Sequence, residues 1–523
     1  MSREEEIKKG LYEHTLVGEA PEVIELTQEG IDLGMDPLDI LFGALIPSLQ
    51  EVGRLFEIGE YFVPEMLVAA RAMQGAMGLL RPLLVDKGAE PIGKVVMLTV
   101  KGDVHDIGKN LVDIILTNNG FEVVNLGIKV PSEQLIQAAR KHGPDVIGLS
   151  GLLVKSAQQM VATAGDLRDA GIGTDLVVGG AALTRRFTHN RIAPEYGGVC
   201  TYAGDAMSGL DLIERLCDGD RRGDVLGRIE ALRERDRAPA RDGAGMKTAA
   251  PTERRSSTVR TDIAAPRPHD LERHAACFDL DDVWPHLNLQ MLYAKHLGLK
   301  GSVERLRAAG DPKLLKVEAV VEDLKEFARG GMEVRGVWRF FPAGAAGNRL
   351  TLLDPGGGGA EKVAAEWLLP RQPREDGLCL ADYVLPAGDH VALFVVTAGA
   401  GVRETAGRFK HEGEYLKSHA YAALALETAE AAAELLHQRL RAELGFPDPP
   451  EMTTRERLAA RYRGKRYSFG YPACPDLAGQ RQLFAALEPA DIGVELTEGD
   501  MMDPEATVSA LVFHHPDARY FGV

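Results

Sequence analysis

The stretch that decides the fold is a polar loop between two apolar segments, Lys101-Gly102-Asp103-Val104-His105-Asp106-Ile107-Gly108-Lys109-Asn110. An apolar run at residues 95–100 precedes it, and a helical pattern at residues 111–116 follows it. The order of strand, glycine-bearing loop and helix predicts the first unit of an α/β sheet. Ligands of such sheets bind beyond the carboxyl ends of the strands, which is where this loop must lie.

The loop offers one imidazole flanked by carboxylates. In an extended segment Asp103 and His105 point to the same side, because they are two residues apart. Asp103 can therefore hold one ring nitrogen of His105, while the other nitrogen ligates a metal. Zinc does not fit, since it takes three or four protein ligands and no further Cys or His lies nearby at a usable spacing. A lone histidine suits a metal already held by a macrocycle, haem or corrin; the alternative is a phosphate-binding loop.

The spacing Asp103-x-His105-x-x-Gly108 resembles the signature of cobalamin-binding domains, and residues 100–110 resemble the cobalamin-dependent methionine synthase family. This resemblance implies that His105 displaces the cofactor's own dimethylbenzimidazole and is the axial ligand to cobalt. It implies a relay of His105, Asp103 and Ser156 beneath the metal, with Val154 standing where the family has threonine. The implied cobalamin contacts in this part of the chain are Gly102, Asp103, Val104, His105, Asp106, Gly108, Ser150, Val154, Gly179, Gly180 and Ala206.

Composition limits the classes of protein that this chain can belong to. Its 523 residues predict three or four domains, and 45% hydrophobic with 26% charged residues is typical of a globular protein. We expect no signal peptide and no membrane span, since no apolar run has the required length. Five cysteines without C-x-x-C spacing favour the cytoplasm over a disulfide framework. The net charge of −17 argues against nucleic acid as the main partner.

The order of periodic segments predicts a multidomain protein. Residues 1–90 show helical periodicity only, which predicts an all-α, four-helix antiparallel cap. Residues 91–218 alternate strands and helices, which predicts a Rossmann-like (flavodoxin-like) parallel sheet with strands at 95–100, 121–126, 145–150, 175–179 and 199–202.

Beyond the predicted sheet, residues 219–270 are rich in arginine and polar residues, which predicts a flexible linker with one short helix at its start. Residues 271–523 predict a separate α+β domain. We expect one long helix at 401–443, and strands at 337–341, 378–384 and 390–397.

Two further segments carry the family resemblance. Phe56 and Val63, in Gly53-Arg54-Leu55-Phe56-x5-Phe62-Val63-Pro64, match the part of the family's cap that covers the methyl-bearing face of the corrin. In the last domain, Arg466-x-x-x-Gly470-Tyr471 resembles the family's motif for S-adenosylmethionine, and the matching contacts are Asp282, Arg466, Gly470, Tyr471, Tyr520 and Phe521.

These side chains have a chemistry that suits S-adenosylmethionine. Arg466 can pair with the ligand's carboxylate and Asp282 with its ammonium, while aromatic faces suit a sulfonium and an adenine. Phe521 stands where the family usually has tyrosine, so the resemblance implies one hydroxyl contact fewer.

The resemblance follows the family's domain order along nearly the whole chain. It implies methyl carriage on cobalamin and reductive reactivation of cob(II)alamin with S-adenosylmethionine, within the transfer of a methyl group from 5-methyltetrahydrofolate to homocysteine. It also implies a flavodoxin or similar reductase as a partner. The chain is then the C-terminal half of such a methyltransferase, as a fragment or a split subunit. The zinc-bearing homocysteine module and the folate module would lie elsewhere, because 88 helical residues cannot form a barrel of about 250 residues.

One alternative remains open at this point, and two others lack a module that they would need. A corrinoid carrier for methanol or methylamine methyltransferases would explain residues 1–217 equally well, but not Asp282, Arg466 or Tyr520. A cobalamin-dependent light sensor that regulates transcription would need a DNA-binding module, and the sequence shows no basic helix-turn-helix region at either end. A cobalamin mutase would need a barrel and would have no helical cap.

Overall fold

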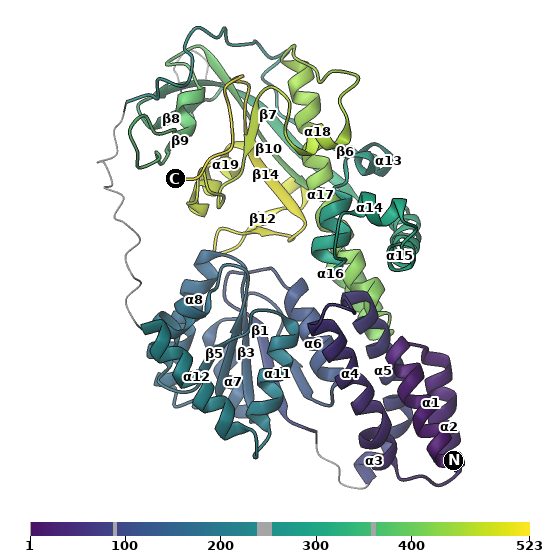
Figure 1. Cartoon of the computed structure of the whole chain (residues 1–523). Coiled ribbons are helices and arrows are strands. Elements are labelled where there is room, and N and C mark those ends of the chain that lie inside the picture. The colour runs from purple at the N-terminus through teal and green to yellow at the C-terminus, as the bar shows by residue number, and fades with distance from the viewer. Residues whose placement is uncertain (1, 87–90, 238–253, 357–361) are drawn as a thin grey trace. The chain divides into compact units, whose positions relative to one another are not determined.

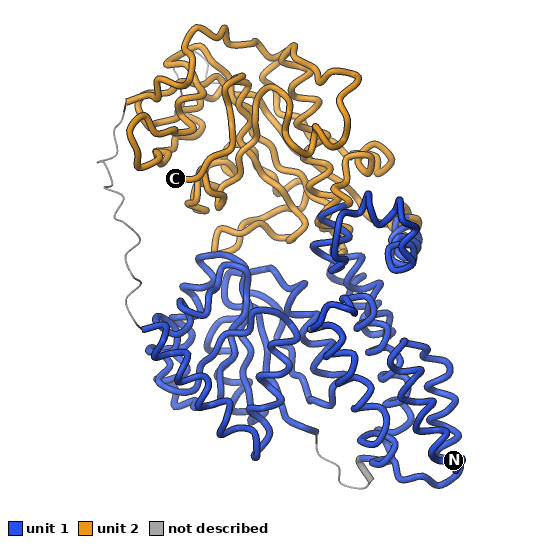
Figure 2. Tube along the Cα trace, viewed as in Figure 1, with its two compact units in different colours: residues 1–241, 290–325, 403–423 blue, residues 242–289, 326–402, 424–523 orange. Residues whose placement is uncertain are grey.

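The computed structural model describes residues 2–86, 91–237, 254–356 and 362–523. The chain divides into two compact units, which Figure 2 shows in different colours. Unit 1 comprises residues 1–241, 290–325 and 403–423, and unit 2 comprises residues 242–289, 326–402 and 424–523. Three helices cross this division: α15 (Pro312–Arg329), α16 (Val402–His411) and α17 (Tyr415–Glu443).

Unit 1 begins with the predicted helical bundle. A capping box formed by Ser2 and Glu5 starts the first helix, and Gly18 ends it with a φ of +79° that favours glycine. Proline stands at the start of the following segments, where a missing N–H costs no intrahelical bond. The helices are α1 (Arg3–Val17), α2 (Ala20–Asp32), the continuous run α3 (Pro37–Ile40), η1 (Leu41–Leu45) and α4 (Ile46–Glu57), and α5 (Val63–Asp86).

A parallel sheet follows the bundle. Its five strands are β1 (Lys94–Thr99), β2 (Glu122–Asn125), β3 (Val146–Ser150), β4 (Asp175–Gly179) and β5 (Cys200–Tyr202), in the order β2-β1-β3-β4-β5. The intervening helices are α6 (Ile107–Asn118), α7 (Ser132–His142), α8 (Val154–Asp169), α9 (Arg185–Phe187), η2 (Thr188–Ile192), α10 (Ala193–Tyr196), α11 (Ala206–Cys217) and α12 (Arg222–Arg237). The predicted parallel sheet is therefore confirmed (Figure 1).

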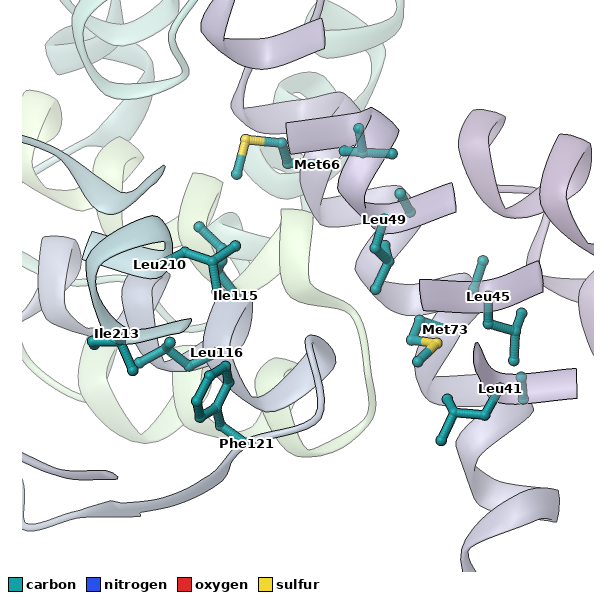
Figure 3. Packing of buried hydrophobic residues seen from close by; sticks show 14 of the residues in the cluster. Leu41, Leu45, Leu49, Met66, Met73, Ile115, Leu116, Phe121, Leu210 and Ile213 are labelled. Carbon is teal, nitrogen blue, oxygen red and sulfur yellow. The ribbon is translucent and has the colours of Figure 1, made fainter. Parts of the chain in front are cut away.

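Successive side chains of β1 point to opposite faces of the sheet and so contribute to two different hydrophobic cores. Val95 and Met97 face one cluster, which includes residues of α6 and α11, whereas Val96 and Leu98 face another, formed with α7, α8 and α10. The first cluster continues into the helical bundle. Figure 3 shows its members from both parts: Leu41, Leu45, Leu49, Met66, Met73, Ile115, Leu116, Phe121, Leu210 and Ile213. Both faces of the sheet are covered, which explains why the strand sequences are nearly continuous apolar runs.

The strand order places a topological switch point between β1 and β3. The chain runs from β1 outward to β2 and then returns to place β3 on the other side of β1. Connections leave the carboxyl ends of β1 and β3 in opposite directions, which opens a crevice at that edge of the sheet. The fold therefore positions the loop that contains His105 where α/β proteins bind ligands.

Further segments complete unit 1. They include η4 (Met291–His296), α14 (Val303–Ala308) and parts of the three helices that cross the division. Helix α12 joins the sheet domain: Arg233 donates to the carbonyls of Gly198 and Cys200, and Asp236 bonds to Arg185 and His189. We therefore propose that this domain extends to residue 237. The predicted linker continues into residues 238–253, which lie outside the described residues.

Unit 2 is built on an antiparallel sheet. The order is β11-β14-β10-β7-β8-β9, and β6 pairs with β7. Its strands are β6 (His274–Phe278), β7 (Val334–Ala346), β8 (Arg349–Leu353), β9 (Val363–Leu368), β10 (Asp389–Thr397), β11 (Lys465–Tyr467) and β14 (Thr507–Phe513), with a separate pair β12 (Glu495–Leu496) and β13 (Met502–Asp503). The smaller helices are α13 (Leu280–Val283), η3 (Trp284–His286), η5 (Leu380–Tyr383), α18 (Thr454–Leu458), η6 (Leu477–Gly479), α19 (Gln480–Leu487) and η7 (Pro489–Ile492).

The α+β class is confirmed, but two predicted elements in this region are wrong. The strand expected at 378–384 is instead the 3₁₀ turn η5, because Asp382 is buried, accepts the Cys379 N–H and forms an ion pair with Arg371. The single helix expected at 401–443 is two helices, α16 and α17. They are separated at Gly413, whose φ of +77° is outside the helical region. No helix among the described residues is long and apolar enough to cross a membrane.

We expect Arg371→Met to destabilise unit 2 by roughly 3–5 kcal/mol, because it would leave the Asp382 carboxylate charged and buried without its partner. Arg371 donates to both oxygens of Asp382, at 2.7 and 2.8 Å, and both side chains are almost fully buried. Urea unfolding followed by tryptophan fluorescence reports on this unit, because the three tryptophans of the chain all belong to it: Trp284, Trp338 and Trp367.

Arg374→Met is the matched control for this substitution. Arg374 is exposed, and among the described residues its side chain bonds only to the side chain of Gln372. Its loss should therefore leave the unfolding midpoint near that of the parent chain. Equal midpoints for the Arg371 and Arg374 variants would contradict a structural role for the buried pair.

Candidate functional site

The carboxyl edge of the parallel sheet brings together loops that are distant in the sequence. The loop after β1 turns at Gly102, which is buried and has a φ of +77°. Asp103 follows with no exposed surface, whereas the side chain of His105 remains 23% exposed. Helix α6 then begins after Asp106. The imidazole therefore lies at the switch point, with a buried carboxylate behind it.

The Asp103 carboxylate accepts four hydrogen bonds. One oxygen accepts the backbone N–H of His105 at 2.9 Å and lies 2.7 Å from its Nδ1. The other accepts the Leu152 N–H at 2.8 Å and the Ser156 hydroxyl at 2.5 Å. Leu152 and Ser156 follow β3, so this carboxylate joins the loops on both sides of the switch point. The predicted grouping of His105, Asp103 and Ser156 exists in the structure.

These bonds determine the charge of Asp103. Burial alone would raise the pKa of its carboxyl group, but hydrogen bonds from His105 and Ser156 outweigh burial, and the pKa is lowered. An ionised carboxylate can only accept, so Nδ1 of His105 must be the protonated nitrogen. A metal would consequently be ligated through Nε2.

Glycines allow these loops to approach each other closely. A Cβ on Gly180 would lie 1.7 Å from the Gly151 carbonyl oxygen, and the φ of Gly180 is +149°. A Cβ on Gly151 would lie 2.5 Å from the Cβ of Ser156 and 3.1 Å from Asp103 Oδ2. The loop after β4 therefore packs against the loop after β3 only because both positions lack a side chain.

The other residues predicted at this edge occupy its rim. Ser150 ends β3, Gly179 ends β4, and Ala206 begins α11; all three are half-buried. Val104 is buried, Gly108 is exposed in the first turn of α6, and Val154 is 67% exposed at the start of α8. The structure thus gathers the predicted residues on one edge, and their contacts with a cofactor stay predictions.

Phe56 and Val63 pack against helix α6. Both belong to an apolar cluster that contains Ile114 and Leu111 of α6, together with Tyr415 of unit 1. Val63 is buried there and Phe56 is half-buried. Their predicted contact with the methyl-bearing face of a corrin is not tested by this packing and stays a prediction.

A second group of predicted residues surrounds Arg466 in unit 2. Arg466 lies on β11, where its Nη2 donates to Glu430 at 3.2 Å and lies 3.8 Å from Glu434. Both glutamates come from α17. Burial alone would lower the pKa of the Arg466 guanidinium, but the two carboxylates outweigh burial and raise it, so the group stays charged. Its Nη1 is buried and donates to no atom of the described residues.

Aromatic side chains flank this arginine. Gly470 turns with a φ of +87° and its N–H donates to the Cys474 carbonyl, which presents Tyr471 with 61% of its surface exposed. Tyr520 is 55% exposed, and its ring lies 5.5 Å from that of Tyr467. The Phe521 ring lies 6.4 Å from the Tyr467 ring. Arg466, Tyr520 and Phe521 are thus joined through neighbours on or near β11.

Asp282 is linked to a different part of α17. Its exposed carboxylate pairs with Arg439 at 3.2 Å. Arg439 follows Glu430 by nine residues, which is roughly 13 Å along a helix. In the described part of the chain, Asp282 and Arg466 share no hydrogen bond or ion pair, and the predicted role of Asp282 stays a prediction.

Sequence reasoning missed three neighbours of Arg466: Glu430, Glu434 and Tyr462. The two glutamates share one face of α17 with His437 and Arg441, at spacings of four, seven and eleven residues from Glu430. Charged residues on one face of a helix rich in alanine and leucine were a signal that could have revealed them. Tyr462 has no such pattern.

Comparison with known families agrees with this geometry. Residues 7–81 and 93–211 each match a family described as a B12 binding domain. Residues 314–523 match the family "Vitamin B12 dependent methionine synthase, activation domain". These matches assign the chain two B12 binding domains followed by the activation domain of vitamin B12 dependent methionine synthase. The predicted family is thereby confirmed.

Two curated methionine synthases align with almost the whole chain. The enzyme of Mycobacterium tuberculosis is 33% identical over 562 aligned residues, and that of Mycobacterium leprae is 32% identical over 561. Each alignment covers 96% of this chain but 46% of the relative. The chain thus spans about half the length of the methionine synthases that it matches.

Solved structures resemble parts of this chain. The MetH reactivation domain bound to AdoHcy has a TM-score of 0.46 and 26% identity, and the match covers 50% of this chain and 84% of that one. The methanol:cobalamin methyltransferase complex MtaBC from Methanosarcina barkeri has a TM-score of 0.38 and 28% identity, with coverage of 44% and 84%.

We expect Gly180→Ala to loosen the loops at the sheet edge, because its Cβ cannot coexist with the Gly151 carbonyl oxygen at 1.7 Å. Displacement of Gly151 would weaken the neighbouring bond from the Leu152 N–H to Asp103. Hydrogen exchange of the Leu152 amide should accelerate by about tenfold or more, measured by mass spectrometry of peptides that span residues 149–156.

Gly171→Ala provides the control for backbone strain. Gly171 also has a positive φ, +72°, but a Cβ there meets nothing within 4 Å. It should leave exchange at Leu152 unchanged. Equal acceleration in both variants would show that strain at a positive φ, rather than the contact with Gly151, causes the effect.

Proposed function

We propose that this chain binds cobalamin at the carboxyl edge of its parallel sheet, with His105 Nε2 as the axial ligand to cobalt, and that it carries a methyl group there. The observation that supports this most directly is the buried Asp103 carboxylate, 2.7 Å from His105 Nδ1 and 2.5 Å from the Ser156 hydroxyl. Cobalamin, when bound, supplies a cobalt that accepts and gives up a methyl group.

The residues of the edge fit this cofactor. A macrocycle supplies four ligands to its metal, so one protein nitrogen is sufficient, and Asp103 fixes the tautomer and direction of that imidazole. The ionised carboxylate also makes His105 a stronger electron donor. Glycines after β3 and β4 leave a rim without bulky side chains, and exposed Leu152 and Val154 add apolar surface beside it.

Unit 2 supports a second binding site, for S-adenosylmethionine. Arg466 has a buried Nη1 without a partner among the described residues, which can donate to the ligand's carboxylate. Glu430 pairs with Nη2 and its side chain is 46% exposed, so its carboxylate can also pair with the ammonium. Exposed Tyr471 and Tyr520 offer faces for the adenine and the sulfonium.

Together these sites support reductive reactivation of cob(II)alamin with S-adenosylmethionine, and the family matched by residues 314–523 is described as an activation domain. S-adenosylmethionine would give its methyl group to cobalt and leave as S-adenosylhomocysteine, while a flavodoxin or similar reductase would supply one electron. We further propose that the chain acts in the cytoplasm, within methionine formation from homocysteine and 5-methyltetrahydrofolate. The zinc-bearing homocysteine module and the folate module would belong to the part of the relatives that this chain does not cover.

A corrinoid carrier for methanol or methylamine methyltransferases is the alternative. It would account for residues 7–211, which match B12 binding domains. It gives no role to residues 314–523, which match the methionine synthase activation domain. The methionine synthase function is therefore favoured.

We expect the chain to bind cobalamin with its dimethylbenzimidazole displaced and His105 on cobalt, because Asp103 and Ser156 hold the imidazole at the switch point. The visible absorption spectrum of bound cobalamin should differ between the parent chain and His105→Gly. His142→Gly, at the end of α7 and away from this edge, should keep the parental spectrum. Identical spectra for the parent and His105→Gly, with dimethylbenzimidazole still on cobalt, would mean that another ligand holds the metal.

We expect Arg466→Ala to weaken S-adenosylmethionine binding by ~1.5–3 kcal/mol, the usual worth of a charge-assisted hydrogen bond. Cobalamin binding should not change, since that site belongs to unit 1. Calorimetry on the whole chain measures both, with Arg461→Ala, a highly exposed neighbour, as the control. An unchanged affinity in Arg466→Ala would remove this arginine from the site.

A further inference from the structure

Beneath Arg466, α17 turns a polar face toward β11. Glu434, His437 and Arg441 lie on this face and are 6%, 0% and 1% exposed. Buried polar groups cost free energy unless they find partners. The contacts of these three side chains therefore show what the face is organised around.

All three side chains contact Tyr462. Its hydroxyl donates to Glu434 Oε2 at 3.2 Å, the Arg441 guanidinium lies 3.7 Å from its ring centroid, and the His437 ring meets it edge-on at 5.2 Å. Asp448 fixes Arg441 through two bonds of 2.8 and 2.6 Å. Burial lowers the pKa of His437 well below its usual range, so this imidazole stays neutral. The Tyr462 ring is thus held from several sides.

The Tyr462 hydroxyl lies near two residues predicted to contact S-adenosylmethionine. On one side it bonds to Glu434, whose carboxylate lies 3.8 Å from Arg466 Nη2. On the other side it lies near Tyr520, close enough for the two side chains to interact electrostatically. Glu434 and Tyr462 therefore support Arg466 from behind, close to Tyr520.

We propose that Glu434 and Tyr462 are positioning residues for the amino acid end of S-adenosylmethionine. The inference rests on the proposed site at Arg466. Glu434 holds the Nη2 side of the guanidinium, and the Tyr462 hydroxyl fixes the Glu434 carboxylate. Nη1, which has no partner among the described residues, is then left for the ligand's carboxylate. An arginine fixed in this way loses less side-chain entropy when it binds a carboxylate.

The test compares two ligands that share the adenosine and sulfur but differ at the amino acid end. Tyr462→Phe keeps the ring against Arg441 and removes only the hydroxyl. Calorimetry on the whole chain should show S-adenosylmethionine binding weakened about three- to tenfold. Binding of 5′-methylthioadenosine, which has no carboxylate or ammonium, should not change. Glu434→Gln should give the same selectivity, because a neutral amide holds a guanidinium less firmly.

Two controls separate positioning from general damage. Tyr196→Phe removes a buried hydroxyl from the sheet domain, where it bonds to the Thr174 carbonyl, and should leave both ligands unaffected. Tryptophan fluorescence during urea unfolding should give Tyr462→Phe a midpoint close to that of the parent chain.

Three results would overturn the inference: unchanged S-adenosylmethionine affinity in Tyr462→Phe, an equal loss for 5′-methylthioadenosine, or a loss that matches a lowered unfolding midpoint. The proposed function fails separately, if Arg466→Ala leaves S-adenosylmethionine binding unchanged. A loss confined to S-adenosylmethionine at a parental midpoint supports the positioning role.

Discussion

The buried carboxylate of Asp103 is the constraint on which the sheet edge depends. A charge without exposed surface is costly unless hydrogen bonds replace its hydration. Asp103 obtains four such bonds, from the loop after β1 and the loop after β3. The same bonds fix the direction of His105 and the distance between the two loops. This arrangement requires glycine at positions 151 and 180, since a side chain at either position would separate the loops.

Unit 2 uses an acidic side chain in a related way, but with a cation as its partner. At the sheet edge a carboxylate orients an imidazole, and on α17 the carboxylates of Glu430 and Glu434 orient the Arg466 guanidinium. In both cases the acid supports a group that faces the predicted ligand. The difference is the origin of the acid. Asp103 lies two residues from His105, whereas Glu434 precedes Arg466 by thirty-two residues and belongs to another element.

This difference decides how much could be predicted from the sequence. Apolar runs bounded by turn residues were sufficient for the five parallel strands, because both faces of that sheet are covered. The pair Asp103 and His105 was visible in its local spacing. Contacts that depend on backbone groups or on tertiary partners were not visible, such as the Leu152 N–H on Asp103 or Tyr462 beneath Arg466.

The wrong predictions in unit 2 have the same cause. Residues 378–384 are mostly apolar, but Asp382 cannot sit in a buried strand without Arg371, eleven residues earlier, and that pairing selects a tight turn. The break between α16 and α17 depends on Gly413, where a helical pattern continues on both sides. Missed strands such as β11 and β14 form only as partners of each other and of β10. Hydrophobic periodicity describes one segment at a time, whereas the structure of these elements depends on the segments with which they pair.

The buried network of α17 is difficult to explain by stability alone. Well-packed apolar residues of similar volume often replace a buried ion pair at no cost, and sometimes with a gain. Arg441, Asp448 and Glu434 could therefore give way to a hydrophobic cluster without loss of the fold. Such a cluster would leave Arg466 beside Glu430 only, at the exposed edge of the helix, where its guanidinium could rotate. Retention of charge beneath Arg466 is thus best understood as a means of fixing direction, which is what recognition of a planar carboxylate requires.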